Sequence, residues 1–171
     1  VKKLESKMAK EKPKGKIGIA HTRWATHGKP SEKNAHPHVS NNRVFIVHNG
    51  IIENYVALKE QLIKKGYQFN SQTDSELIAH QLDFFLNQGS EMLDAMSLLK
   101  EKLEGAYAVA AIDLKNESHF YLMRNKSPLL LGQSDSGMFA ASDPLALADL
   151  TNEFIFLEDG DVAEVSAKEY K

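Results

Sequence analysis

The densest group of polar side chains in the sequence lies at residues 21–28, which read HTRWATHG. Arg23 can bind a carboxylate through two parallel charge-assisted hydrogen bonds. Trp24 adds a flat apolar wall that could cover a bound ligand, and the alternative is an Arg–Trp pair that stacks at the surface without any ligand. The segment therefore predicts a site for a carboxylate-bearing ligand at the end of a strand.

A second candidate site directly follows the apolar strand that we predict at Arg43–His48. Asn49 carries an amide donor, and Gly50 has no Cβ, so its backbone N–H is open to close approach. A side-chain amide beside a backbone N–H is a common oxyanion hole. Asn-Gly is also a strong signal for a two-residue hairpin, which the local sequence favours, whereas the helical pattern after Ile52 argues against a hairpin.

A third candidate is Thr73-Asp74-Ser75-Glu76, at the start of a predicted helix. Thr73 as the N-cap residue and Glu76 reaching back to it would form a capping box, which the local sequence favours. A carboxylate at Asp74 could also hold the ammonium group of a ligand. The two interpretations are compatible with each other.

The histidines raise the question of a metal site. His36 and His38 have a spacing found in some zinc sites, and His21, His27 and His48 lie on either side of them. The sequence has no HExxH pair and no cysteine thiolate. We predict no metal and no cofactor, and interpret the histidines as loop residues with hydrogen-bond partners. A metal-dependent hydrolase built on His36 and His38 is the alternative.

Strands at both ends of the chain and helices between them must position these candidates. Apolar positions at helical spacing predict three helices, and alternating or continuous apolar runs predict strands. The helical stripes run over Tyr55–Leu62, Ile78–Leu86 and Met92–Leu103, and the strands are expected at Lys16–Trp24, Arg43–His48, Tyr107–Leu114, Phe120–Met123, Leu129–Leu131, Met138–Ser142, Phe154–Glu158 and Val162–Val165. The long polar stretch 25–42 is expected to be a functional loop.

The order of these elements favours an α+β fold over a parallel βαβ sheet. Leu129–Leu131 and Phe154–Leu157 are continuous apolar runs, which are typical of strands covered on both faces. Two stacked sheets with helices outside would satisfy this pattern.

Composition is that of one globular domain: 171 residues, 42% hydrophobic and 26% charged. The net charge of −2 gives no reason to expect nucleic acid as a partner. Residues 1–16 carry seven lysines, but Glu5 and Glu11 interrupt them, so we predict a basic surface helix or tether at residues 1–14. No membrane span, signal peptide or cysteine is present, which predicts a cytoplasmic location.

Taken together, the candidate segments match one family in order and spacing. They read AHTRWATHGKPS at residues 20–31, NAHPHVS at 34–40, VHNGIIENY at 47–55 and TDSELIAH at 73–80. This pattern resembles the glutaminase domain of the glutamine–fructose-6-phosphate aminotransferases, which are class II amidotransferases with an N-terminal nucleophile. The likeness covers roughly residues 15–165 and includes GAYAVAAID, SPLLLG, ASDPLAL and FIFLEDGDVAEV.

The resemblance implies a four-layer α/β/β/α sandwich of the N-terminal-nucleophile hydrolase type. It also implies that the amide of L-glutamine is hydrolysed to ammonia, which is used to make glucosamine 6-phosphate from fructose 6-phosphate. Arg23 would bind the α-carboxylate of L-glutamine, and Thr26 and His27 would support that end of the site. Asp74 would pair with the α-ammonium group, assisted by the backbone of Gly50.

For catalysis, the resemblance implies that Asn49 and Gly50 form the oxyanion hole. Trp24 would belong to a loop that covers the site and gates the passage of ammonia. The implied partners are L-glutamine and the C-terminal sugar isomerase domains of the same enzyme, which bind fructose 6-phosphate. The full-length enzyme is expected to be a homo-oligomer.

The sequence departs from this family at its nucleophile. The family uses an N-terminal cysteine whose own α-amino group acts as the base, whereas this sequence starts at Val1 and contains no cysteine. The family's strands before the region that matches Gly15 are also missing. We therefore expect residues 1–171 to be a single, N-terminally truncated glutaminase domain that is inactive alone. The alternative is a non-catalytic, glutamine-binding regulatory module.

Overall fold

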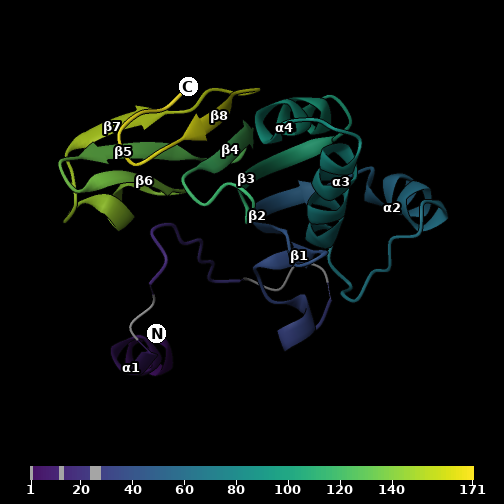
Figure 1. Cartoon of the computed structure of the whole chain (residues 1–171), viewed down its shortest axis with the longest axis horizontal. Coiled ribbons are helices and arrows are strands. Elements are labelled where there is room, and N and C mark those ends of the chain that lie inside the picture. The colour runs from purple at the N-terminus through teal and green to yellow at the C-terminus, as the bar shows by residue number, and fades with distance from the viewer. Residues whose placement is uncertain (1, 12–13, 24–27) are drawn as a thin grey trace.

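The computed structural model describes residues 2–11, 14–23 and 28–171 and has an α+β fold, as expected (Figure 1). Its helices are α1 (Lys2–Glu11), α2 (Tyr55–Lys64), α3 (Ser75–Asn87) and α4 (Met92–Lys100), with 3-10 helices η1 (Glu32–Asn34) and η2 (Pro144–Leu147). Its strands are β1 (His38–Ser40), β2 (Val44–Ile52), β3 (Gly105–Asp113), β4 (Phe120–Asn125), β5 (Leu130–Ser134), β6 (Gly137–Ala141), β7 (Glu153–Phe156) and β8 (Val162–Val165).

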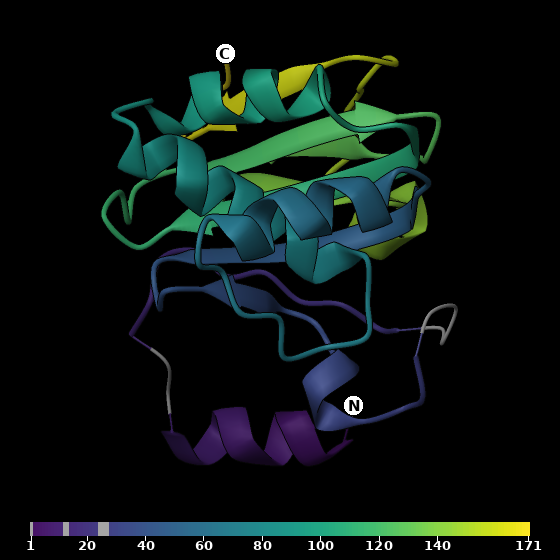
Figure 2. The same ribbon diagram turned by 90° about the vertical axis from the view of Figure 1, so that its right-hand side faces the viewer.

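The strands form two antiparallel sheets, one of five strands in the order β1-β2-β3-β4-β8 and one of three in the order β6-β5-β7. Helices α3 and α4 cover one face of the larger sheet, α2 packs beside α3, and the smaller sheet lies behind them (Figure 2). Over the outer face of the smaller sheet, η2 is the covering element among the described residues, and its Leu147 approaches Gly132. Two stacked sheets with α-helices on one outer face are as expected, but within the described residues the other outer face carries the 3-10 helix η2 in place of an α-helix.

Two apolar clusters hold these layers together. The larger lies between the helices and the five-stranded sheet, and Ile46, Leu77 and Val109 within it are fully buried. The smaller lies between the two sheets and includes Leu122 and Val165. Alternate residues of β2 face the helices, so the strand that carries Asn49 and Gly50 is anchored in the larger cluster.

The three central helices are confirmed, as are all the strands expected after residue 106. The run Phe154–Leu157 is only partly as predicted, because Phe156 is 64% exposed. Ile155 packs against the cluster between the two sheets, so Phe156, the next residue of β7, points to the opposite face of the smaller sheet and stays exposed.

Two expectations near the candidate site were wrong. Residues 16–23 of the predicted strand Lys16–Trp24 form no strand, and among the described residues the larger sheet ends at β1. Trp24 itself lies outside the described residues. The stretch 25–42, expected to be a loop throughout, contains η1 and β1. A strand of three residues is too short for an alternating pattern to be recognised in the sequence.

The hairpin that local sequence favoured at Asn49-Gly50 was also wrong. Strand β2 continues through both residues to Ile52, with Gly50 opposite Tyr107 of β3. Glycine is required there by close approach of the two strands rather than by a turn, because a Cβ on Gly50 would collide with the carbonyl oxygen of Ala106.

Helix α1 lies apart from the sheets in both ribbon views (Figures 1 and 2), and residues 5–11 are exposed. No helix in the described part of the chain is long and apolar enough to cross a membrane.

Candidate functional site

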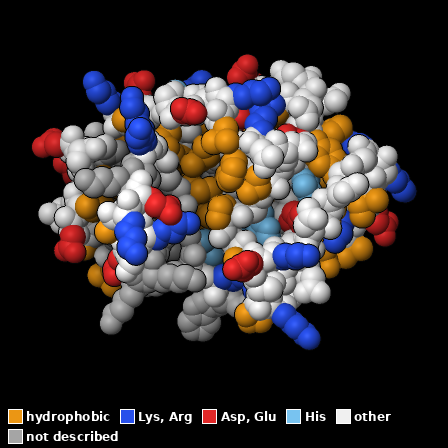
Figure 3. All heavy atoms as spheres, turned by 60° about the horizontal axis from the view of Figure 1, so that its bottom comes forward, with side chains coloured by type: hydrophobic (Ala, Val, Ile, Leu, Met, Phe, Trp, Pro, Cys, Tyr) orange, Lys and Arg blue, Asp and Glu red, His pale blue; other side chains and the backbone are white. Residues whose placement is uncertain are grey.

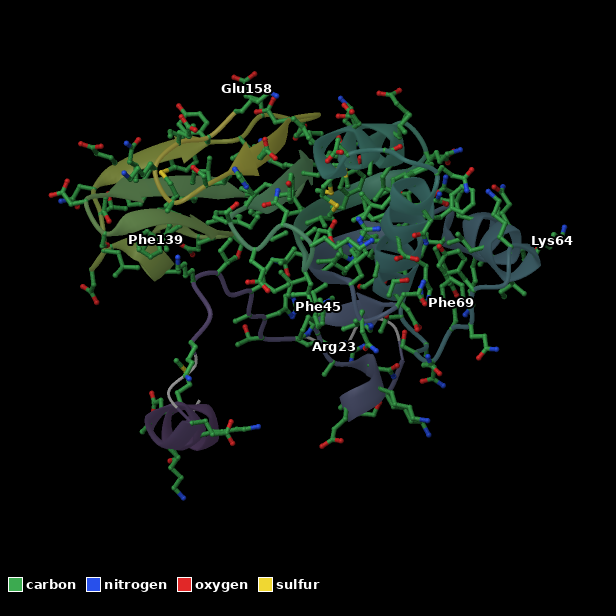
Figure 4. All side chains as sticks on the ribbon, viewed as in Figure 1. Arg23, Phe45, Lys64, Phe69, Phe139 and Glu158 are labelled. Carbon is green, nitrogen blue, oxygen red and sulfur yellow. The ribbon has the colours of Figure 1, made fainter. Side chains whose placement is uncertain are left out.

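Four separate segments of the chain surround one cavity of about 200 Å³. The lining residues are His21, Thr22, Arg23, His36, His48, Asn49, Gly50, Thr73, Asp74 and Ser75. The structure therefore brings together Arg23, Asn49, Gly50 and Asp74, which the sequence analysis had selected from three separate motifs. Histidine side chains are visible beside a group of hydrophobic side chains on the face shown in Figure 3. Arg23 lies at the lower edge of the domain body in Figure 4.

The side-chain amide of Asn49 has a fixed orientation. Its Oδ1 accepts a hydrogen bond of 2.7 Å from Nε2 of His21. Since a carbonyl oxygen can only accept, Nε2 of His21 is the donor in this bond. Because Oδ1 of Asn49 is bonded to His21, the side chain of Asn49 can offer its amide N–H groups to a ligand as donors.

Gly50 places a bare stretch of backbone at the cavity wall. Its φ of +127° lies in the region that glycine adopts readily and other residues rarely do. The position that a Cβ would take is occupied by the backbone of Ala106 and Tyr107. Any side chain here would push β2 away from β3, so the wall is glycine for steric reasons.

Asp74 supplies a buried carboxylate at the start of α3. The residue is 3% exposed, and its Oδ2 accepts a hydrogen bond of 2.8 Å from the backbone N–H of Ile52. This bond ties the first residue before α3 to the end of β2. A buried carboxylate is stabilised by hydrogen bonds and by a cationic partner, so Asp74 is suited to a ligand's ammonium group.

The capping box predicted for Thr73 and Glu76 was wrong. Thr73 Oγ1 is hydrogen bonded to Nε2 of His38 at 2.9 Å, and Glu76 accepts from the backbone N–H groups of Asn70 and Ser71. Burial raises the pKa of Glu76, but hydrogen bonds from His80, Asn70 and Ser71 outweigh it and lower the pKa to about 2. Glu76, in the first turn of α3, thus holds the backbone of Asn70 and Ser71 in place instead of reaching back to Thr73.

Two imidazoles of the cavity wall are neutral at neutral pH. Burial lowers the pKa of His48 to about 4, although the nearby Asp74 acts in the opposite direction. Burial, with the charges of neighbouring histidines and of Arg23, lowers the pKa of His36 to about 3. Nδ1 of His48 is hydrogen bonded to Oγ of Ser75 at 2.9 Å. These two rings therefore shape the wall without adding charge between Arg23 and Asp74.

The described histidines of the cavity wall contact one another through their rings. The ring centroids of His21 and His36 are 4.1 Å apart, and those of His36 and His38 are 4.8 Å apart. Within residues 2–11, 14–23 and 28–171, no group of three or more histidine, aspartate or glutamate side chains is placed to hold a metal ion.

Three predicted residues cannot be placed, and the structure adds contacts near the cavity that the sequence did not predict. Trp24, Thr26 and His27 lie outside the described residues. Asn34, which the sequence did not single out, is 3% exposed and hydrogen bonded to Gln72. His21 belonged to the polar cluster, but its bond to Asn49 could not be foreseen because it joins segments distant in the sequence.

The family model and the relatives of similar sequence described here are all glutamine-dependent amidotransferases or aminotransferases. A family model described as a glutamine amidotransferase domain matches residues 21–149. The glutamine–fructose-6-phosphate aminotransferase (isomerizing) of Vibrio parahaemolyticus is 46% identical over 169 residues, which are 99% of this chain and 28% of that protein. The same-named protein of Yersinia pseudotuberculosis is 49% identical over 154 residues, 90% of this chain and 25% of that protein. The chain thus spans about a quarter of the length of these relatives.

Solved structures agree on the fold. The glutamine phosphoribosylpyrophosphate amidotransferase of B. subtilis, in complex with ADP and GMP, superposes with a TM-score of 0.73 at 24% identity. The match covers 88% of this chain and 33% of that one. The fold is therefore that of the N-terminal-nucleophile amidotransferases.

Proposed function

The chain belongs to the glutamine amidotransferase domain family, and on this premise we propose that it is the glutamine-recognising part of an enzyme that makes glucosamine 6-phosphate from fructose 6-phosphate and L-glutamine. The observation that carries this proposal is that Arg23 and Asp74 line the same cavity as Asn49-Gly50. L-Glutamine has a carboxylate, an ammonium group and a carboxamide. The cavity offers a cation, an anion and amide donors, which match these three groups.

Each group of the ligand is assigned to a lining residue. Arg23 binds the α-carboxylate, and Asp74 binds the α-ammonium group with help from the backbone of Gly50. The side-chain amide of Asn49 and the backbone N–H of Gly50 face the carboxamide oxygen. The supporting roles of Trp24, Thr26 and His27 stay predictions.

The reaction proposed for the intact enzyme is an acyl transfer. A thiolate attacks the carboxamide carbon, and the carbonyl oxygen becomes negatively charged in the tetrahedral intermediate. Asn49 and Gly50 stabilise that oxygen. The C–N bond then breaks, ammonia leaves after taking up a proton, and water hydrolyses the thioester to glutamate. Residues 1–171 contain no cysteine, so they supply binding and oxyanion stabilisation but no thiolate.

The use of the ammonia is assigned to the rest of such an enzyme. The relatives are about three and a half times as long as this chain. We propose that sugar isomerase domains, C-terminal to these residues, bind fructose 6-phosphate and accept the ammonia. Assembly as a homo-oligomer and a cytoplasmic location stay predictions.

A second candidate function is a regulatory module that binds glutamine without hydrolysing it. The observation in its favour is the absence of cysteine from residues 1–171. The coding sequence upstream of Val1 separates the two. A cysteine codon directly after the initiator methionine supports the enzyme, and its absence supports the module.

Titration of the isotope-labelled chain with L-glutamine, followed by backbone amide NMR, tests the proposal. We expect shifts centred on Gly50 and on Ile52, because the N–H of Ile52 bonds to Asp74. D-Glutamine is the control, since its inverted α-carbon cannot place both charged groups. Equal shifts with both enantiomers, or shifts only at residues away from the cavity, would remove the basis for the proposal. Incubation with L-glutamine should release no glutamate.

A further inference from the structure

We propose that Asn34 and Gln72, which are hydrogen bonded to each other, form an amide clasp that holds Arg23 at a fixed distance from Asp74. The clasp makes the cavity selective for a ligand that carries an α-carboxylate and an α-ammonium group on one carbon. This inference rests on the proposed function and deepens it. Neither residue of the clasp is among the described residues that line the cavity, so both act through others as positioning residues.

Asn34 uses its whole side-chain amide to join two segments. Its Nδ2 donates to the carbonyl oxygen of Lys29 at 2.9 Å and to Oε1 of Gln72 at 3.2 Å. Its Oδ1 accepts from the backbone N–H of Gln72 at 2.9 Å. Asn34 is 3% exposed. A buried amide with this many partners is rigid, and losing any of them leaves a buried polar group unpaired.

Arg23 is connected to this clasp through Gly28. The Nη2 of Arg23 donates to the carbonyl oxygen of Gly28 at 3.3 Å. Gly28 is packed against the clasp so closely that a Cβ there would lie 2.6 Å from Nδ2 of Asn34 and 2.9 Å from Cβ of Gln72. The backbone that Arg23 contacts is therefore in close contact with Asn34 and Gln72, and it cannot move toward them without displacing one of these side chains.

Asp74 is connected to the clasp through the turn before α3. Gln72 precedes Asp74 by two residues, and the intervening Thr73 is fixed by its bond to His38 at 2.9 Å. Asp74 is fixed by its bond to the N–H of Ile52. Because Thr73 alone separates Gln72 from Asp74, a shift of Gln72 strains the bonds that hold Thr73 and Asp74 in place.

The consequence concerns which ligands the cavity accepts. A ligand with one charged group needs Arg23 or Asp74 but not their mutual position. An α-amino acid needs both Arg23 and Asp74 at a fixed separation, and a small error in that separation lowers the binding affinity. The clasp should therefore matter for L-glutamine and much less for glutaramate, which lacks the ammonium group, or γ-aminobutyramide, which lacks the carboxylate.

Calorimetric titration of the chain with these three ligands tests the clasp. The variants are Asn34→Ala and Gln72→Ala, alone and combined. Asn54→Ala is a matched control, because Asn54 also joins two segments with one amide, donating to the carbonyl of Lys102 at 2.8 Å and accepting from the N–H of Glu104 at 3.2 Å. We expect Asn34→Ala to weaken L-glutamine about tenfold and the single-charge ligands less than about threefold. Asn54→Ala should change no affinity.

Unchanged affinity for L-glutamine in Asn34→Ala overturns the clasp, and so does an equal loss for all three ligands, which would mean general damage to the cavity. If the unaltered chain does not bind L-glutamine, the proposed function fails instead. Hydrogen exchange without ligand then decides the clasp. Faster exchange at the Ile52 N–H in Asn34→Ala than in Asn54→Ala supports it, and equal rates overturn it.

Discussion

His21 and Asn49 come from segments far apart in the sequence, yet Nε2 of His21 lies 2.7 Å from Oδ1 of Asn49. This contact turns a mobile side-chain amide into one with a fixed donor direction. The proposed oxyanion hole depends on such orientation, because donors are effective only when they point at the oxygen before the charge develops.

The first prediction concerns this pair in the proposed full-length enzyme, which would supply the thiolate that residues 1–171 do not contain. Asn49→Ala should lower kcat for glutamine hydrolysis by about a hundredfold and leave KM nearly unchanged, since the negative charge on the oxygen is absent from bound glutamine and develops only as the tetrahedral intermediate forms. His21→Phe should lower kcat in the same way but by a smaller factor. Steady-state glutamate release measures both, with His119→Phe on a distant turn as control. A rise in KM at constant kcat would show that Asn49 binds the ground state instead.

The second prediction concerns Gly50. A side chain there meets the carbonyl of Ala106 and must adopt a φ near +127°. Gly50→Ala should therefore lower the free energy of unfolding by about 3 kcal/mol or more. Gly66→Ala is the control, because Gly66 has a φ of +93° but open space around it, and it should cost only about 1 kcal/mol. Urea unfolding compares the two, and equal losses would refute the steric explanation.

The positions of elements with long apolar patterns could be predicted from the sequence. Helix α3 and strand β3 are examples, because each buries a regular set of side chains in the larger apolar cluster. The errors occurred where contacts distant in the sequence decide the structure. Oγ1 of Thr73 is bonded to His38, 35 residues away, and pairing with β3 extends β2 through Gly50.

The same distinction applies to the candidate site. Arg23, Asn49 and Asp74 stand in dense polar motifs, and the structure places them around one cavity. Their roles remain predictions. Asn34 and Gln72 could not be found in the sequence, because a lone asparagine and a lone glutamine in polar stretches have no distinguishing pattern and become informative only through their mutual contacts.

The third prediction concerns pH. The pKa of His48 is 6.5 in the unfolded chain and about 4 in the folded one. Between these pH values the unfolded state binds a proton that the folded state does not. The contribution of His48 to the free energy of unfolding is therefore fully present above pH 6.5 and is lost as the pH falls toward about 4. The slope should reach about 1.4 kcal/mol per pH unit for this residue alone. His36 and Glu76, whose pKa values are also lowered, extend the loss to lower pH.

Urea unfolding at about pH 7 and about pH 5 measures this loss, and His48→Asn should reduce it. Stability that is equal at the two pH values in the unaltered chain would mean that the histidines are not buried as neutral rings.

The central claim is that the cavity recognises the α-amino acid end of L-glutamine, and Asp74→Asn tests it most directly. Asparagine keeps an oxygen that can accept from the N–H of Ile52 but removes the negative charge. The control is Asp83→Asn, because Asp83 is 1% exposed and bonded to Asn41 and Tyr67 away from the cavity. Calorimetric titration with L-glutamine should show a loss of affinity of about thirtyfold or more for Asp74→Asn and none for Asp83→Asn. Equal affinities for the unaltered chain and Asp74→Asn would contradict the claim.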